Sequence, residues 1–529
     1  MKCDKILIVG GGSAGWMTAA TLIKAYPKKD ITVLESPNIP TISVGESTIN
    51  AVKHWTKFLG IKDEEFLKHT DGTVKFSIKF TDFNGKDEAP FYYPFGPVVT
   101  EGTQFGYNDW WMKKAFNPEL PVSDYADSYA PVMALVNQRK GAYEFKIPGM
   151  KMSQIQEFDI DRDSAYQFDA IKFGIWLRDH YCIPRGVKHI KEHIEDIKQD
   201  ENGIVSLNGK HKADLYVDCT GFKSLLLGGA LKEPFEPVKN LPNNKAWVTK
   251  IPYVDKTKEV EAFTNCTAIE NGWVWNIPLW SRVGAGYVYS DKFVDDETAL
   301  KEFKNHLAKV RPGYGTEEHE FRNIKMKCGI HQRLFVKNVV AIGLSAGFIE
   351  PLESNGLFSV HEFLMMLVRN ISRDKITQWD KDNFSFACKY TYNRFLEFVG
   401  MHYALSTRDD TEYWKAINNT VWEESLYTFK AKINLGYFQA ALHRNLSSEF
   451  PVDPSSNPGR SGIHFIAAGF NWAPQDLPNL VNTTHKSEEE IREYMAPFIR
   501  RLDERKAKWN KEVEKFPSYH DFIEKVYYK

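Results

Sequence analysis

The first hydrophobic run of the chain is short and stops at a cluster of glycines. Residues 5–9, Lys-Ile-Leu-Ile-Val, have the length and composition of a buried strand, and residues 16–25 carry helix formers throughout. A second apolar run over residues 31–34 follows and ends at Glu35. The pattern predicts a strand, a glycine turn, a helix and a second strand, as at the start of an α/β fold.

Two later apolar runs predict strands that return to this first unit. Residues 213–221 and 338–343 are mostly apolar, and each run ends in glycine. Between them, apolar residues alternate over about 245–289, which predicts an inserted sheet.

After residue 374 the pattern turns mainly helical. Ser487 and Glu490 have the spacing of a capping box, and apolar residues follow at helical intervals. Pro497 predicts a kink or a fresh start in that helix. We therefore expect a discontinuous α/β module over 1–380, with a sheet inserted at about 235–325, and a helical region over 381–529 that covers the substrate.

The glycines after the first strand have the spacing of a dinucleotide-binding turn. Gly10, Gly12 and Gly15 form G-x-G-x-x-G, and Glu35 follows Gly15 by twenty residues, where a ribose would lie. Such a turn brings the backbone close to a pyrophosphate at the start of the helix. The returning strands favour FAD, held as in proteins of the glutathione-reductase type, over a nicotinamide cofactor. A glycine-rich turn in an unrelated α/β unit is the alternative.

Composition excludes several classes of protein. The 529 residues predict two to four domains, and a net charge of −1 argues against binding driven by charge to nucleic acid or an anionic membrane. The sequence contains neither an apolar run long enough to span a membrane nor a signal-peptide core. Six scattered cysteines without a C-x-x-C pair indicate reduced thiols in a cytoplasmic protein, and no metal-binding motif appears. Aromatic residues are abundant, at 14%.

The pattern G-x-S-x-G, known from serine hydrolases, occurs over 343–347 and again over 11–15. The later copy follows a predicted strand, but Pro351 comes soon after it and no clear Asp and His partners follow. We therefore disfavour a hydrolase.

Four other segments carry candidate chemistry. Residues 272–278 read Gly-Trp-Val-Trp-Asn-Ile-Pro, with both tryptophans on one face of a strand. Residues 348–356, Phe-Ile-Glu-Pro-Leu-Glu-Ser-Asn-Gly, precede an apolar helix predicted over 357–371. Residues 74–80 place two lysines in a mostly apolar strand, and residues 402–411 form a dense polar run that begins His-Tyr.

With the glycine-rich opening and Ser-Val-Gly-Glu-Ser-Thr over 43–48, these segments resemble the flavin-dependent halogenases of the tryptophan-halogenase family. The similarity runs in order from residue 1 to about residue 415. It implies that reduced FAD, supplied by a separate flavin reductase, reacts with oxygen, and that halide is then oxidised to hypohalous acid. The acid travels inside the protein to a second site that holds a small electron-rich aromatic substrate.

The resemblance also implies a role for individual residues. Lys75 matches the lysine that delivers the halogen, and Glu353 matches the glutamate that assists it. The other matching positions fall into four groups: for FAD, Gly10, Gly12, Ser13, Ala14, Gly15, Glu35, Val44, Gly45, Glu46, Gly343 and Leu344; for halide, Ser354, Asn355 and Gly356; for the barrier between flavin and substrate, Trp273, Trp275, Ile277 and Pro278; and for the substrate ring, Tyr93 and Phe95.

The residue types suit these roles. A lysine between Val74 and Phe76 is partly desolvated, which lowers its pKa and permits either a neutral amine that takes up halogen or a hydrogen-bond donor to hypohalous acid. A nearby glutamate can polarise the oxidant or accept the ring proton. The plainer interpretations are a strand lysine that reaches solvent, as Lys79 shows, and tryptophans that only pack in the core.

The sequence departs from the family at two places. Asn355 stands where the family usually has threonine, which leaves the halide open; because bromide and iodide are easier to oxidise than chloride, we hypothesise that the protein uses them. Residues 457–462, Asn-Pro-Gly-Arg-Ser-Gly, replace the aromatic residues and acid that grip free tryptophan, so we expect a different aromatic substrate.

Two other functions stay open on the sequence alone. A single-component FAD-dependent hydroxylase would reduce its own flavin and let the substrate meet the activated flavin directly, which the tryptophan pair argues against. A non-catalytic flavin-binding protein would leave halide unconsumed. The sequence is compatible with a monomer or a homodimer.

Overall fold

A six-stranded sheet, mostly parallel, contains the first strand of the chain. In this computed structural model its order is β19-β20-β11-β1-β2-β8, and every neighbouring pair is parallel except β19 and β20. The strands are β1 (Lys5–Val9), β2 (Asp30–Glu35), β8 (Lys188–Lys191), β11 (Leu215–Asp218), β19 (Phe335–Val336) and β20 (Val339–Ala341). They come from three separate stretches of chain, which confirms the predicted return of the later strands to the first unit.

The structure describes residues 1–39, 45–103, 108–143, 155, 157–311, 319–373, 375–424, 462–471 and 485–529. Helix α1 (Ser13–Ala25) follows β1 directly and packs on α8 (Ala170–Trp176) and α11 (Phe358–Asn370). The sequence predicted α11 to within one residue at each end. Within the described ranges, no helix is both long and apolar enough to cross a membrane.

The inserted sheet has seven strands in the order β17-β13-β16-β15-β14-β5-β6. Residues 245–325 supply β13 (Lys245–Pro252), β14 (Phe263–Ile269), β15 (Gly272–Pro278), β16 (Arg282–Tyr289) and β17 (Arg322–Lys325). The alternating pattern over about 245–289 predicted a sheet where β13, β14, β15 and β16 lie, but it did not extend to β17. It did not predict that β5 (Ser77–Thr81) and β6 (Phe91–Pro94), from far earlier in the chain, extend the same sheet, with β5 parallel to β14.

The single strand predicted over 74–80 is wrong, because the chain breaks at Phe76. β4 (Thr73–Lys75) pairs with β7 (Ala165–Phe168) in a three-stranded sheet that also holds β3 (Glu46–Ser47), whereas β5 belongs to the seven-stranded sheet. At the break, the Phe76 amide donates to the carbonyl of Ala262 over 2.7 Å. Lys75 therefore lies where the two sheets meet.

Smaller strands and short helices fill the space around these sheets. The remaining strands are β9 (Ile197–Asp200), β10 (Gly203–Leu207), β12 (Phe235–Pro237), β18 (Gly329–His331) and β21 (Gly347–Phe348). The remaining helices before residue 374 are α2 (Val52–Leu59), α3 (Asp63–Phe66), α4 (Asn108–Phe116), α5 (Asp124–Tyr129), α6 (Val132–Asn137), α7 (Ile160–Asp163), α9 (Lys256–Glu259) and α10 (Asp296–Val310).

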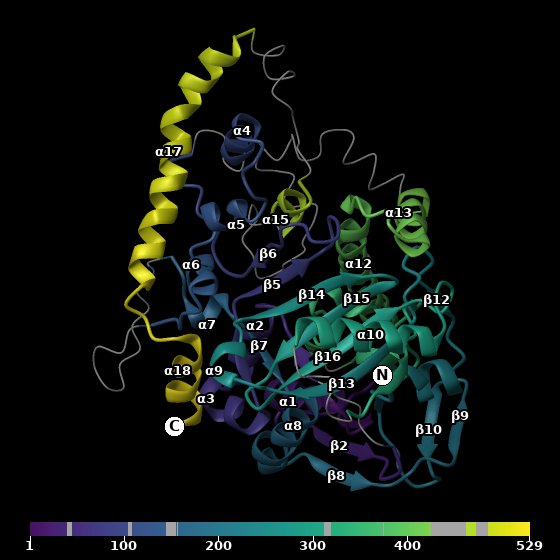
Figure 1. Cartoon of the computed structure of the whole chain (residues 1–529). Helices are drawn as coiled ribbons and strands as arrows, with labels where there is room; N and C mark the ends of the chain where they lie inside the picture. Colours follow the sequence, from purple (N-terminus) through teal and green to yellow (C-terminus); the bar gives the residue numbers. More distant parts are fainter. Residues whose placement is uncertain are drawn as a thin grey trace.

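After residue 374 the described chain is helical, as predicted. It forms α12 (Gln378–Leu405), α13 (Glu412–Glu424), α15 (Gly462–Gly469), α17 (Glu488–Val513) and α18 (Tyr519–Ile523). Figure 1 shows α17 as a long helix along one side of the molecule, where it packs on α4, α5 and α6. The predicted capping box at Ser487 is formed, but α17 is one helix through Pro497, so no fresh start occurs there.

Candidate active site

A cavity of about 680 Å³ lies between the glycine turn after β1 and the seven-stranded sheet. Most of the residues predicted to hold FAD line it: Gly10, Gly12, Ser13, Ala14, Glu35, Gly45, Glu46, Gly343 and Leu344. Gly15, in the first turn of α1, does not line the cavity, and Val44 lies outside the described residues. The turn, the two sheets and the segment before α11 thus surround one space.

The glycine turn has the shape that a pyrophosphate requires. A Cβ on Gly15 would lie 1.9 Å from the carbonyl oxygen of Gly10, so only glycine lets α1 start this close to the turn. Gly12 is the N-cap of α1 and supplies no side-chain cap, which leaves the first N–H groups of the helix for an anion at the cavity wall. These features fit FAD.

Glu35 stands at the end of β2, as a ribose-binding carboxylate would. Its Oε2 lies 2.7 Å from Nε2 of His189, and its side chain packs against Gly11, where a Cβ would lie 2.2 Å from the carboxyl carbon. His189 was not predicted from the sequence, because it lies on β8, a strand that the sequence pattern did not single out.

Lys75 has no exposed surface and lies directly behind the cavity wall. Its Nζ donates to Oγ of Ser47 over 2.8 Å, to Oγ of Ser354 over 2.8 Å and to the carbonyl of Thr48 over 3.1 Å. Both serines line the cavity. Burial lowers the pKa of Lys75 from 10.5 to about 7, against the opposing pull of Cys266 and Glu353. At neutral pH the amine therefore exists in both protonation states.

Lys75 also lies near an aromatic ring. Its Nζ lies 5.2 Å from the centre of the Phe95 ring, and Phe95 packs edge-on against Tyr93 with ring centres 5.8 Å apart. Neither ring lines the 680 Å³ cavity. Helix α15 covers Tyr93, because a Cβ on Gly462, its first residue, would lie 2.7 Å from Cζ of Tyr93. Residues 457–461, the predicted departure in the substrate region, lie outside the described residues.

Glu353 is fully buried near Lys75, and burial raises its pKa. Its Oε1 lies 2.6 Å from Nε2 of His402, at the end of α12. The sequence placed His402 in a polar run but gave no signal that this run would meet Glu353. Pairing of a helix end with a distant loop is a tertiary contact that spacing along the chain does not reveal.

The segment after Glu353 forms a tight loop. Ser354 has a positive φ of 57°, and the side-chain Nδ2 of Asn355 donates to the backbone carbonyl of Ile349 over 3.2 Å. In the described part of the chain, no hydrogen bond forms from the backbone N–H groups of Asn355 or Gly356. These two groups are free to bind an anion, and Ser354 and Gly356 line the cavity while Asn355 lies behind the wall.

Glu46 lies against this loop. A Cβ on Gly356 would lie 2.2 Å from Oε1 of Glu46, so the carboxyl group occupies the space that a larger residue would fill. Desolvation raises the pKa of Glu46 to about 7, which favours its neutral form beside the place for an anion. The motif predicted Glu46 near FAD, but its contact with Gly356 was not predictable from the sequence.

The two tryptophans of β15 have different surroundings. Trp275 lines the cavity together with Ile277, and its ring lies over Gly286, where a Cβ would be 2.1 Å from Cζ2. Trp273 is fully buried, with its ring centre 6.0 Å from that of Trp275, and neither Trp273 nor Pro278 lines the cavity.

The hydrolase pattern over 343–347 has no exposed nucleophile. The Ser345 hydroxyl is 1% exposed and donates to the backbone carbonyls of Asp218 and Ile342, which gives it a structural role.

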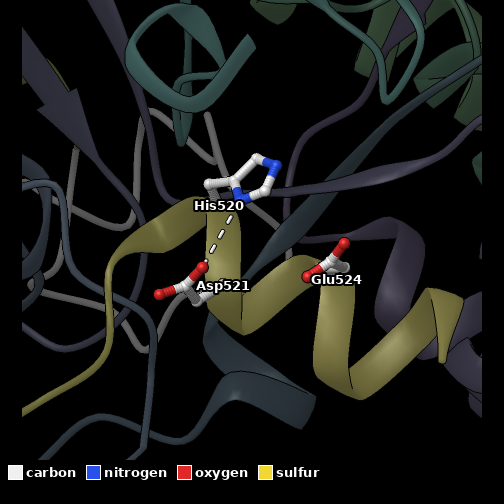
Figure 2. Close-up of side chains that lie close together, drawn as sticks. All are labelled: His520, Asp521 and Glu524. Carbon is white, nitrogen blue, oxygen red and sulfur yellow. Dashed lines mark hydrogen bonds and ion pairs between the residues drawn. The ribbon is translucent and has the colours of Figure 1, made fainter.

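One side-chain cluster on α18 and the following turn has the composition of a metal site. Figure 2 shows His520, Asp521 and Glu524, whose ligand atoms lie within 4.8 Å of one another. However, the His520 ring stacks on Trp280 with centres 5.2 Å apart, and Glu524 pairs with Lys529 over 2.7 Å. Because two of the three side chains have other partners, we assign no metal to this cluster.

Comparison with known proteins identifies the family of this chain. The model of the family described as tryptophan halogenase matches residues 5–450. Tryptophan 7-halogenase RebH of Lentzea aerocolonigenes is 33% identical over 438 residues, which cover 78% of this chain and 79% of RebH.

Solved structures agree over almost the full length. The apo structure of VirX1 has a TM-score of 0.86 at 34% identity and covers 100% of this chain and 99% of VirX1. Tar14, a tryptophan C-6 flavin-dependent halogenase from taromycin biosynthesis, has a TM-score of 0.82 at 27% identity, with 99% of both chains covered. The chain therefore belongs to the tryptophan-halogenase family of flavin-dependent halogenases, enzymes with an FAD-binding Rossmann-like fold.

Proposed function

We propose that this enzyme uses reduced FAD and oxygen to halogenate an electron-rich aromatic other than free tryptophan, through hypohalous acid delivered to Lys75. The position of Lys75 carries the proposal. Its Nζ binds two serines of the cavity wall and also lies 5.2 Å from the centre of the Phe95 ring. Lys75 thus bridges the space for the cofactor and the predicted ring site.

The residues around the cavity have distinct tasks in this proposal. The uncapped start of α1 and the glycine turn bind the pyrophosphate of FAD. Bound reduced FAD supplies, with oxygen from solution, the oxidising power that converts halide to hypohalous acid. The free N–H groups of Asn355 and Gly356 hold the halide, and Trp275 and Ile277 separate the cavity from the substrate.

The chemistry at Lys75 follows from its burial. Hypohalous acid leaving the cavity meets the hydroxyls of Ser47 and Ser354 and then the amine, which either donates a hydrogen bond to the oxidant or takes up the halogen. A pKa of about 7 permits both. Glu353 then assists substitution on the ring as a proton donor and acceptor.

The substrate and the halide follow from the two departures from the family. Residues 457–462 lack the groups that grip free tryptophan, so an indole without amino-acid recognition, a phenol or a larger natural product fits better. Asn355 in place of threonine reshapes the loop of the proposed halide site, and we propose that bromide and iodide are used. A separate flavin reductase supplies the reduced flavin by diffusion.

The test gives the purified protein reduced FAD, oxygen, each halide in turn and a panel of indoles and phenols. We expect products with the mass of added halogen, and more brominated or iodinated than chlorinated product when halides compete. Lys75→Ala should lose these products, whereas Lys79→Ala, four residues away on β5, should keep them. Chloride incorporation alone contradicts the halide proposal, and full activity of Lys75→Ala contradicts the role of Lys75.

The same assay separates the two alternatives. NADPH oxidation and hydroxylated product without an added reductase would indicate a single-component hydroxylase. Halide that stays unconsumed with reduced FAD and oxygen present would indicate a flavin-binding protein without catalysis.

A further inference from the structure

Two side chains at the end of helix α12 contact the two glutamates of the 350–353 segment. His402 Nε2 lies 2.6 Å from Oε1 of Glu353, and the neighbouring Tyr403 donates its hydroxyl hydrogen to Oε1 of Glu350. Asn243 donates to the other oxygen of Glu350 over 2.8 Å. The polar run that begins at residue 402 thus has a partner for each acid, and only Glu353 lies near Lys75.

His402 is fully buried and has one tautomer available for a neutral ring. Its Nδ1 lies 3.0 Å from the backbone carbonyl of Phe398, and because a carbonyl oxygen only accepts, Nδ1 carries a hydrogen. Nε2 therefore faces Glu353 with either a lone pair or a second hydrogen. The rings of Phe80 and Phe398 pack on the imidazole, with centres 4.9 and 5.2 Å away.

The distance favours a proton between the two groups. A lone pair on Nε2 and an ionised Oε1 would repel each other at 2.6 Å, whereas one proton on either atom makes the contact attractive. In the described residues, Oε1 and Oε2 of Glu353 and Nε2 of His402 all lack a hydrogen-bond partner of good geometry, so the 2.6 Å contact is close but poorly aligned. Three other titratable groups act on the pair: Lys75 and the thiol of Cys266 on Glu353, and Glu350 on His402.

We propose that His402 is a positioning residue that shares one proton with Glu353, so that Glu353 can give a proton and take one back within a turnover. This inference rests on the proposed function. It assigns His402 no contact with substrate.

The proton balance of the reaction fits one shared proton. Halogenation converts an aromatic C–H and hypohalous acid into an aromatic C–X and water. The X–O bond breaks, its electron pair leaves with the hydroxyl group, and the proton shared by Glu353 and His402 completes the water molecule. The ring carbon forms the C–X bond and then loses its proton to Glu353, while the C–H electron pair restores the aromatic ring. The Glu353–His402 pair returns to its starting state.

The first test needs no cofactor or substrate. Infrared difference spectra between the wild-type protein and Glu353→Gln, supported by the ¹⁵N signal of Nε2 in protein labelled at histidine, report where the proton lies. We expect a hydrogen-bonded carboxylic acid or a protonated Nε2 in the wild type, lost on substitution. A carboxylate beside an unprotonated Nε2 would overturn the proposal.

The second test uses His402→Gln, which keeps a donor near Glu353 but cannot shuttle a proton. Tyr403→Phe is the matched control, because it removes the bond to Glu350 on the same helix end and segment. Perdeuterated and ordinary indole are compared as substrates under saturating reduced FAD, oxygen and bromide.

In the wild type and in Tyr403→Phe, the two indoles should react at the same rate, since C–H cleavage is fast. In His402→Gln, kcat should fall roughly tenfold or more with little change in KM. The deuterated indole should then react measurably more slowly.

Equal rates for the two indoles in His402→Gln, with kcat unchanged, would overturn the proposal. If His402→Gln fails to fold, the spectra of the wild-type protein still decide the question. If the wild type halogenates no aromatic, the proposed function fails, and the spectra decide the shared proton independently.

Discussion

Lys75 illustrates how much a fully buried amine depends on its neighbours. Three oxygen atoms accept its hydrogens, yet desolvation outweighs the attraction of Glu353 and Cys266 and lowers its pKa to about 7. Lys79 is only partly buried, and its amine lies 5.8 Å from the centre of the Tyr92 ring and 5.7 Å from that of the Phe263 ring. The two lysines of the 74–80 segment therefore differ in chemistry although their sequence surroundings are alike.

The depressed pKa of Lys75 makes the stability of the protein depend on pH in a defined direction. Its pKa is about 7 in the folded protein and 10.5 in the unfolded chain, so between these pH values the unfolded chain binds one more proton. Unfolding free energy thus rises with pH above 7 because of this group, and is flat below 7. The variant Lys75→Met has no amine at this position, so its unfolding free energy lacks this rise with pH.

We expect the unfolding free energy of the wild type, measured with urea, to rise relative to that of Lys75→Met by on the order of 2 kcal/mol between pH 7 and pH 9. Groups away from Lys75 titrate alike in both proteins and cancel, so that only Lys75 and the two groups coupled to it, Glu353 and Cys266, contribute to the difference. A difference between the two proteins that does not change with pH would contradict the burial of a neutral amine.

At the residue scale, the sequence predicted the motif residues of the cavity wall but not the partners behind it. The glycine turn, Glu35, Glu46 and Trp275 belong to compact motifs whose spacing carries the information. His402, which approaches Glu353, depends on how a helix end docks on a loop about fifty residues away. Periodicity and local spacing carry no information about such tertiary contacts.

At the scale of elements, the loop between the 3-10 turn Pro351–Glu353 and α11 joins the cavity to Lys75. Ser354 binds Lys75, and Gly356 packs against Glu46. A side chain at position 356 would displace the Glu46 carboxyl group, because its Cβ would lie 2.2 Å from Oε1.

We predict that Gly356→Ala raises the KM for halide several-fold and changes the thermal midpoint little. The added methyl group and the displaced carboxyl group crowd the proposed halide position, so halide binds more weakly. Steady-state kinetics with varied bromide measure the effect. Gly229→Ala is the control, since its Cβ meets an ordinary contact of 3.5 Å with the carbonyl of Ser224. An unchanged KM for bromide in Gly356→Ala would contradict a role of this loop in halide binding.

The break at Phe76 shows why element boundaries were harder to predict than element types. Apolar residues alternate with lysines across 74–80 without a Gly or Pro, so nothing local ends the strand. The amide of Phe76 instead pairs with Ala262, and Phe95 donates to the carbonyl of Phe76 over 2.9 Å. Competing tertiary partners divide the strand, and this division sets Lys75 between two sheets.

For the whole molecule, one arrangement explains why distant segments share a site. The six-stranded sheet brings the glycine turn to one side of the cavity, and the seven-stranded sheet brings Trp275 to the other. β5 and β6 join the second sheet from the N-terminal part of the chain, so Lys75 and Phe95 lie just beyond the cavity. The domain boundary expected at residue 380 stays a prediction.

The central claim is that oxidant formed in the cavity reaches the aromatic substrate by way of Lys75. The most direct measurement follows two yields in Lys75→Ala with reduced FAD, oxygen and bromide: oxidised halide caught by a freely diffusing trap, and brominated indole. The account predicts that trapped oxidant stays near the wild-type level while brominated indole is lost. Brominated indole at the wild-type level, or loss of both yields together, would contradict it.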